Sequence, residues 1–220
     1  MKVSRISEHI TKLEAWCFFK ISAWLVQADD GVFIVDTGMS FMGERLLREA
    51  EKLGNVKAIL LTHGHSDHVG GVQNILRQRN IPVYAHTLDL DYMEGKAPFP
   101  RRKKPGKLVP PNVVCPLPVN EDGQLETFDD LVPYHTPGHS PGHVVYYHVK
   151  DKVLLSGDLF TSKNGQLQKP MKMFTAYMDQ AIASSRIVSE LKPALVSIAH
   201  SNDVKDAHLQ IDQYVKQSGQ

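Results

Sequence analysis

Three histidines and an aspartate are crowded into one short stretch of the sequence, T-H-G-H-S-D-H-V-G-G. His63, His65, Asp67 and His68 lie within six residues, although the whole chain has only 11 histidines. Imidazole nitrogens and carboxylate oxygens are preferred ligands of divalent transition metals such as zinc. Four such donors so close together suit two ions better than one. The cluster therefore predicts a metal centre rather than a polar loop with solvated histidines.

A loop this short cannot complete the coordination alone, so further ligands are expected elsewhere. Three segments offer them: the T-P-G-H-S-P-G-H loop with His139, the S-G-D sequence with Asp158, and the A-L-V-S-I-A-H sequence with His200. Each follows an apolar, strand-like run. Taken singly, a histidine after a strand is more often a hydrogen-bonded residue than a ligand. Together with the cluster they predict strand ends that converge on one active site.

The elements that must position these residues can be read from the hydrophobic pattern. Strands dominate the first forty residues, including residues 16–26 and a run that ends at Asp36, and strands alternating with helices follow. The remaining expected strands cover residues 56–61, 81–85, 131–135, 144–149, 152–156 and 194–199. The expected helices cover residues 41–53, 69–79, 88–94, 178–191 and 203–216. This order predicts an α/β domain with sheets covered by helices.

Residues 95–118 differ in character from their surroundings. They contain seven prolines and the basic run Arg101-Arg102-Lys103-Lys104, which predicts an exposed excursion rather than a packed element. As a lid, the segment would cover the metal face and attract a substrate carboxylate or phosphate; otherwise it is a solvated surface loop. No linker is evident, so we expect one domain over residues 1–220.

Composition excludes several classes of protein. Apolar residues make up 42% of the chain and charged residues 22%, which is typical of folded globular proteins. A formal net charge of +1 gives no overall attraction to nucleic acid or to anionic membranes. We see no signal peptide and no membrane span, and therefore expect a cytoplasmic protein. The two cysteines, Cys17 and Cys115, are expected to be buried, reduced thiols.

The motifs together resemble those of a known family. Asp36, the H-x-H-x-D-H motif from His63 to His68, His139, Asp158 and His200 match, in order, the five motifs of the metallo-β-lactamase-fold superfamily. The resemblance spans essentially the whole chain. It implies an α/β (α+β) fold, a four-layer αβ/βα sandwich, with the metals at the edge between the two sheets.

The resemblance also implies a role for each motif residue. His63, His65 and His139 resemble the ligands of the first metal, Asp67, His68 and His200 resemble those of the second, and Asp158 resembles the carboxylate that bridges both. Asp36 is similar to the carboxylate that holds the metal loop through hydrogen bonds without touching a metal. His143 is not a usual ligand in this family and is expected to pack or hydrogen-bond nearby.

Such a site predicts hydrolysis. Two divalent ions about 3.5–4 Å apart can share a water and lower its pKa from near 16 to about neutral. We therefore expect a dinuclear hydrolase of a small ester, lactone or thioester, in which a metal-bridging hydroxide attacks and Asp67 takes and returns a proton. The expected cofactors are two divalent ions, zinc first, with iron or manganese as alternatives.

Other branches of the superfamily remain as alternatives. One is a phosphodiesterase or nuclease, for which R-R-K-K is the only support. Another is a mononuclear iron dioxygenase acting on a persulfide, and a third is a non-catalytic binding protein. His65 argues against the flavodiiron proteins, and the twenty residues after His200 argue against a glutathione-binding helical domain. Leu159-Phe160-Thr161 after the aspartate argues against a homoserine lactonase. The sequence names neither the substrate nor the oligomeric state.

Overall fold

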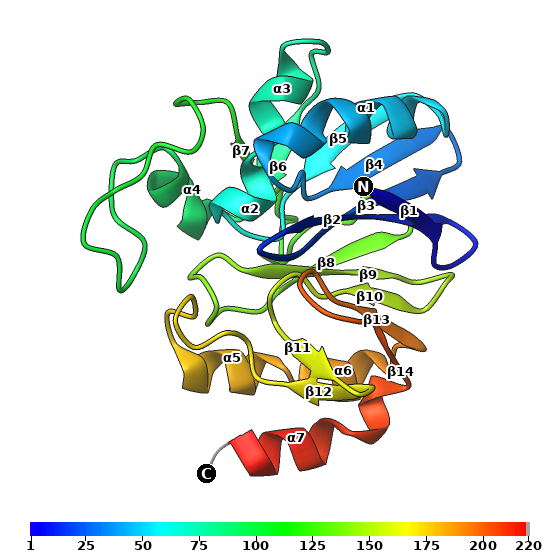
Figure 1. Cartoon of the computed structure of the whole chain (residues 1–220), viewed down its shortest axis with the longest axis vertical. Coiled ribbons are helices and arrows are strands. Elements are labelled where there is room, and N and C mark those ends of the chain that lie inside the picture. Colours follow the sequence, from blue (N-terminus) through cyan, green and yellow to red (C-terminus); the bar gives the residue numbers. More distant parts are fainter. Residues whose placement is uncertain (219–220) are drawn as a thin grey trace. The chain divides into compact units, whose positions relative to one another are not determined.

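Two compact units make up the protein, Met1–Leu117 and Pro118–Gln220. The computed structural model describes residues 1–218 (Figure 1). Each unit is built around one main sheet, with helices packed against it. No helix within the described range is long and apolar enough to cross a membrane.

The sheet of the first unit has seven strands that follow one another in sequence order. They are β1 (Lys2–Arg5), β2 (Ile10–Cys17), β3 (Phe19–Ala28), β4 (Gly31–Val35), β5 (Val56–Leu60), β6 (Val83–Ala85) and β7 (Cys115–Pro116). Strands β1 to β4 are antiparallel, and β4 to β7 are parallel. The helical elements are η1 (Ser40–Met42), α1 (Gly43–Glu51), α2 (Ser66–Val69), α3 (Val72–Leu76) and α4 (Thr87–Met93).

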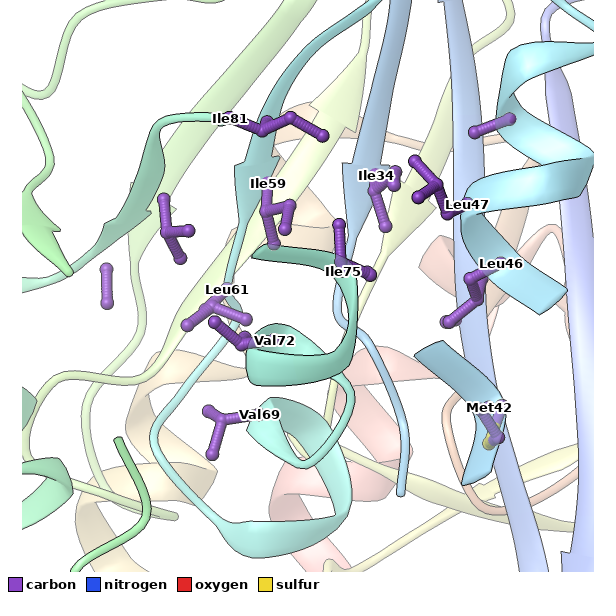
Figure 2. Packing of buried hydrophobic residues seen from close by; sticks show 14 of the residues in the cluster. Ile34, Met42, Leu46, Leu47, Ile59, Leu61, Val69, Val72, Ile75 and Ile81 are labelled. Carbon is purple, nitrogen blue, oxygen red and sulfur yellow. The ribbon is translucent and has the colours of Figure 1, made fainter. Parts of the chain in front are cut away.

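Helices α1 and α3 close the core of this unit. Figure 2 shows Leu46 and Leu47 of α1 and Ile75 of α3 beside the strand residues Ile34 and Ile59, and all five are buried. Fully burying one such aliphatic side chain stabilises a fold by about 1.5–3 kcal/mol. The core therefore fixes the ends of β4 and β5, from which Asp36 and the histidine cluster emerge.

The second unit contains a five-stranded sheet in the order β14-β13-β10-β9-β8 and a separate hairpin of β11 and β12. The strands are β8 (Leu131–His135), β9 (Val144–His148), β10 (Val153–Leu155), β11 (Thr161–Lys163), β12 (Gln166–Gln168), β13 (Leu195–Ser197) and β14 (Val204–Lys205). The helices are α5 (Met178–Ser184), α6 (Ile187–Leu191), η2 (Ala207–Leu209) and α7 (Ile211–Ser218). Val188 of α6 and Tyr214 of α7 pack with Leu154 and Val196 in its core.

Three of the expected elements have different bounds in the structure. The strand expected at residues 16–26 turns at Phe18, whose φ of 62° makes the hairpin between β2 and β3. The helix expected at residues 178–191 breaks into α5 and α6, where the Ser185 hydroxyl donates to the carbonyl of Ile182 and competes with the helical bonds. The expected last helix begins later, because Val204 and Lys205 pair with β13 instead.

The segment at residues 95–118 is an excursion, as expected, and its basic residues are exposed. It is not merely solvated, because Phe99, Val109 and Val114 are buried in the core of the first unit. The expectation of two buried thiols is wrong for both cysteines: Cys115 is exposed on β7, a strand of two residues at the edge of its sheet, and Cys17 is only partly buried.

Candidate metal centre

The histidine cluster follows a buried strand of the first unit. Strand β5 ends at Leu60, and the chain then passes through a loop with His63 and His65 into the short helix α2, which carries Asp67 and His68. Helix α2 begins at Ser66, directly after His65, so both halves of the motif follow the end of β5. The rings of His63, His65 and His68 are buried.

The imidazoles converge on one another. The Nε2 atom of His63 lies 3.1 Å from the Nδ1 atom of His65. The ring centroids of His63 and His68 are 4.0 Å apart. Asp67 is partly exposed, with one carboxylate oxygen 4.0 Å from Nε2 of His68. Several donor atoms therefore crowd one small region of this unit.

Asp36 holds this loop from the end of the neighbouring parallel strand. Its Oδ1 accepts the backbone N–H of Thr62 at 2.7 Å, and its Oδ2 accepts the Thr62 hydroxyl at 2.8 Å. Oδ2 also lies 2.7 Å from Nδ1 of His68. Because an ionised carboxylate can only accept, Nδ1 carries the proton and the lone pair of a neutral His68 is on Nε2. The Thr62 hydroxyl lies 3.1 Å from Nδ1 of His63 and orients that ring in the same way.

A second buried carboxylate, Asp89, supports the loop from helix α4. Its Oδ2 accepts the backbone N–H of Gly64 at 2.9 Å, between the two histidines of the motif. Asp89 is fully buried. The sequence does not predict this role, because nothing in T-L-D-L-D distinguishes Asp89 from Asp91, which is exposed on the same helix.

The second unit brings its own candidate ligands to one edge of its sheet. Strands β10 and β13 are parallel neighbours, and Asp158 and His200 each follow the carboxyl end of one of them. His139 lies in the loop between β8 and β9, which reaches the same edge because β9 runs antiparallel to β10. The three side chains are at most 7% exposed.

The carboxylate of Asp158 lies between two imidazoles. One oxygen is 3.2 Å from Nε2 of His139, and the other is 3.1 Å from Nε2 of His200. The hydroxyl of Thr175 donates to the carbonyl of Met171 and lies 3.3 Å from Nδ1 of His139, so it can accept the proton of that nitrogen. This places the lone pair of a neutral His139 on Nε2, toward Asp158.

His143 uses its ring differently. Its Nε2 accepts the backbone N–H of Asp158 at 3.1 Å, and its Nδ1 lies 2.9 Å from the Thr136 hydroxyl. This agrees with the expectation that it would form hydrogen bonds near the site. It also fixes the backbone that carries Asp158.

Gly138 allows the His139 loop to approach helix α5. Its φ is 134°, and a Cβ atom there would overlap the backbone nitrogen of Ala181. The loop is tied to the start of α5 by backbone hydrogen bonds from Ala176 to His139 and from Tyr177 to Gly138, at 3.0 and 2.8 Å. A residue with a side chain at this position would push the loop away.

The donor atoms within each unit fit divalent metals. Two ligand nitrogens on a tetrahedral zinc ion, each at about 2.0–2.1 Å, lie roughly 3.3 Å from each other. The 3.1 Å separation in the His63–His65 pair and the separations of 3.1 and 3.2 Å around Asp158 are close to that value. In His63, His68 and His139, Nδ1 faces a hydroxyl or a carboxylate, which orients the ring and leaves Nε2 for a metal. Metal-bound histidines are usually held by such a hydrogen bond to the nitrogen that does not bind the metal.

Comparison with known proteins assigns the chain to a family. The model of the metallo-beta-lactamase superfamily matches residues 18–200. The chain therefore belongs to this superfamily of metal-dependent hydrolases, and the expected metallo-β-lactamase fold is confirmed. Divalent metal binding is a property of the family.

Its relatives include hydrolases with different names. The probable metallo-hydrolase YybB of Bacillus subtilis (strain 168) is 37% identical over 208 residues, which is 93% of each chain. The hydroxyacylglutathione hydrolase GloC of Haemophilus influenzae is 30% identical over 144 residues, covering 62% of this chain and 65% of its own length. The crystal structure of the DIM-1 metallo-beta-lactamase exposed to ceftazidime has a TM-score of 0.75 at 20% identity, and the match covers 99% of this chain and 97% of that one.

Proposed function

We propose that the protein is a dinuclear metal-dependent hydrolase of a small ester, lactone or thioester. The ligands in this proposal are the residues predicted from the sequence: His63, His65, Asp67, His68, His139, Asp158 and His200. We propose further that residues 1–220 act as a single metallo-β-lactamase-like domain. The observation that carries the proposal is the position of Asp158, whose two oxygens face different imidazoles, as a carboxylate shared by two ions would.

The chemistry follows from the donor set. When bound, two divalent ions polarise the acyl oxygen and lower the pKa of a water to about 7. The chain's own residues orient the reactants and move protons. Asp67 is partly exposed, so its carboxylate can take a proton during attack and return it to the leaving group. The hydrogen bonds of Asp36 to Thr62 and His68 keep the loop rigid during this transfer.

A thioester is the substrate type that the relatives favour. GloC and two Vibrio cholerae relatives are named hydroxyacylglutathione hydrolases, and that name denotes cleavage of a thioester. YybB, which matches over 93% of each chain, is named only as a probable metallo-hydrolase. We therefore place thioesters first and keep esters and lactones in the proposal.

Zinc is the metal we propose, with iron or manganese as alternatives. Five imidazoles and two carboxylates suit a borderline-soft cation better than Mg²⁺ or Ca²⁺, which prefer oxygen ligands alone. No thiolate belongs to the set.

Reconstitution with zinc tests the proposal. Metal-depleted protein should hydrolyse a panel of acyl thioesters, esters and lactones only after zinc is added. His63→Ala and Asp158→Asn should lower kcat/KM by at least ~100-fold, since each removes a direct ligand. His86→Ala is the matched control. Nδ1 of His86 accepts the backbone N–H of Leu88 at the start of helix α4, and His86 is not a proposed ligand. The activity of this variant should stay within about twofold of wild type. Zinc-loaded protein that cleaves none of these substrates would contradict the proposal.

A further inference from the structure

A cavity of about 110 Å³ lies beside the histidine cluster, entirely within the first unit. Its lining combines one proposed ligand with apolar and basic residues of the excursion at residues 95–118. The lining residues are His65, Ser66, Phe99, Arg102, Lys104, Gly106 and Leu108. Since about 10–15 Å³ of such volume holds one water, the cavity has room for an acidic group with a few carbon atoms.

The wall of the cavity packs directly on the metal loop. The ring of Phe99 is 9% exposed, and its centroid lies 4.9 Å from that of His65 and 4.8 Å from that of Tyr92. A Cβ atom on Gly64 would come within 2.9 Å of Phe99. The glycine of the H-x-H motif is therefore needed for the excursion to reach this position.

Hydrogen bonds to helix α4 hold the base of the excursion. The backbone N–H of Leu108 donates to Met93 at 2.9 Å, and that of Asn112 donates to the Glu94 carboxylate at 2.8 Å. Lys96 lies 2.6 Å from Glu94 and 3.2 Å from Asp91. The carboxylates at this end of α4 thus pair with Lys96, which is outside the cavity lining.

The charged side chains of the excursion are all positive. Residues 95–118 contain six of the 25 Lys and Arg residues of the chain and none of its 24 Asp and Glu residues. The rest of the chain is therefore net acidic. Basic residues at the mouth of a small cavity, with an aromatic wall behind them, create a local positive potential that attracts anions.

We propose that this cavity is an anion subsite, in which Arg102 and Lys104 bind an acidic group of the substrate while Phe99 and Leu108 contact the short carbon chain attached to it. Resting on the proposed function, this names the substrate class as an acyl compound with a carboxylate or phosphate a few atoms from the bond that is cleaved. The guanidinium of Arg102 can bind either group through two parallel hydrogen bonds. His65 lines the same cavity and is buried, so a bound acyl group would lie beside one of the proposed metal ligands.

Anion binding tests the subsite without catalysis. The dissociation constants of succinate and of inorganic phosphate are measured by calorimetry on the full-length protein, for wild type, the double variant Arg102→Gln/Lys104→Gln, and Lys103→Gln. The double variant should bind at least one anion about 5- to 20-fold more weakly, since two partly exposed charge contacts are lost. Lys103→Gln removes the same type of charge next to the cavity but outside its lining, and should change affinity by less than about twofold. The anion that loses more affinity identifies carboxylate or phosphate.

Kinetics test the substrate class on the zinc-loaded protein. A hemisuccinyl thioester is compared with the butyryl thioester of the same thiol, and a phosphate-bearing acyl thioester of similar length is the third substrate. Wild type should prefer an acidic substrate by about tenfold in kcat/KM, and the double variant should lose this preference.

The two proposals fail in different ways. If no thioester is cleaved, the proposed function is wrong, and the calorimetry still decides whether the cavity binds anions. If all the thioesters are cleaved equally and the double variant binds both anions as wild type does, the anion subsite is wrong and the hydrolase stands. Equal losses in the double variant and in Lys103→Gln would also overturn the subsite, because the effect would then come from charge in general.

Discussion

At the scale of single residues, the residues that hydrogen-bond to the histidines say as much about the candidate metal site as the histidines themselves. Asp36 has a left-handed backbone, with φ of 57°, directly after strand β4. This conformation turns its carboxylate toward Thr62 and His68 rather than along the strand. A loop fixed in this way presents its imidazoles in one orientation before a metal arrives.

Substituting Asp36 by asparagine tests that support. Asparagine tolerates the left-handed backbone and keeps the size of the side chain, but only its one oxygen can accept, so it cannot accept from both the Thr62 N–H and His68 Nδ1 as Asp36 does. Affinity for zinc should fall by about 10- to 100-fold, measured by competition with a chelator of known affinity. Asp29→Asn, at an exposed turn, is the control. Equal zinc affinity in both variants would show that Asp36 does not orient the ligand.

Asp89 allows a separate test based on stability. Asp89→Ala leaves the buried N–H of Gly64 without its acceptor, which should lower the free energy of unfolding by about 1–3 kcal/mol. Asp89→Asn keeps an acceptor oxygen and should cost less. Asp91→Ala, on the exposed side of the same helix, should cost at most ~1 kcal/mol. Urea denaturation measures all three, and similar losses for Asp89→Ala and Asp91→Ala would contradict the role of Asp89.

The sequence predicted the direct candidates and the supporting residues Asp36 and His143, but not the partners Thr175 and Asp89. His63, His65, Asp158 and His200 stand out because their types and their positions after apolar runs are local features. Thr175 and Asp89 contact the site residues from 36 and 25 positions away, and no local pattern marks such pairs. The assignment of individual metal ligands remains a prediction from the family resemblance.

At the scale of elements, loops at strand ends carry the site. The T-P-G-H-S-P-G-H loop depends on its close contact with helix α5, which Gly138 permits. Periodicity predicted β5 and β8 within one residue of their observed ends. Periodicity did not predict the break between α5 and α6. The apolar stripe continues through the turn at Ser185, and the hydrogen bond of the Ser185 hydroxyl does not change the hydrophobic pattern.

Gly138→Ala should therefore be strongly destabilising. The added Cβ overlaps the backbone of Ala181 and the backbone conformation is strained, so the loss should be at least ~2 kcal/mol in the free energy of unfolding. Gly106→Ala is the matched control, since a Cβ there meets no atom within 4 Å. Its unfolding free energy should stay within about 1 kcal/mol of wild type. Chemical denaturation compares the two, and equal stability would contradict the close packing of the loop on α5.

Helix α4 holds the excursion in a pH-dependent way. Hydrogen bonds from Lys96 and from the backbone of Asn112 hold the pKa of Glu94 below its ordinary value. Because the folded pKa is lowered, this stabilisation is present above the ordinary value of 4.5 and is lost as the pH falls through the folded pKa. Glu94→Gln should lower the unfolding midpoint at pH 7, and the difference from wild type should close below pH 4.5.

Thermal unfolding from pH 7 to pH 3 measures this difference. Glu121→Gln, an exposed site in the second unit, should follow wild type at every pH. A constant gap between wild type and Glu94→Gln would show that the carboxylate charge is not what holds the excursion.

At the scale of the whole molecule, the family assignment limits the chemistry more than the composition does. A net charge of +1 and an average apolar content fit many kinds of protein. The superfamily match over residues 18–200 restricts these possibilities to the metal-dependent proteins of the metallo-beta-lactamase superfamily. The choice between the two-ion hydrolase and the mononuclear iron dioxygenase then depends on how many ions the chain holds.

Metal content decides this most directly. Protein purified without added metal is analysed for all transition metals, together with its concentration from amino-acid analysis. The proposed site predicts about two divalent ions per chain, mainly zinc, and Asp158→Asn should reduce that number. A content of one iron ion per chain would contradict the two-metal hydrolase. So would protein that contains no metal and does not bind zinc when zinc is added.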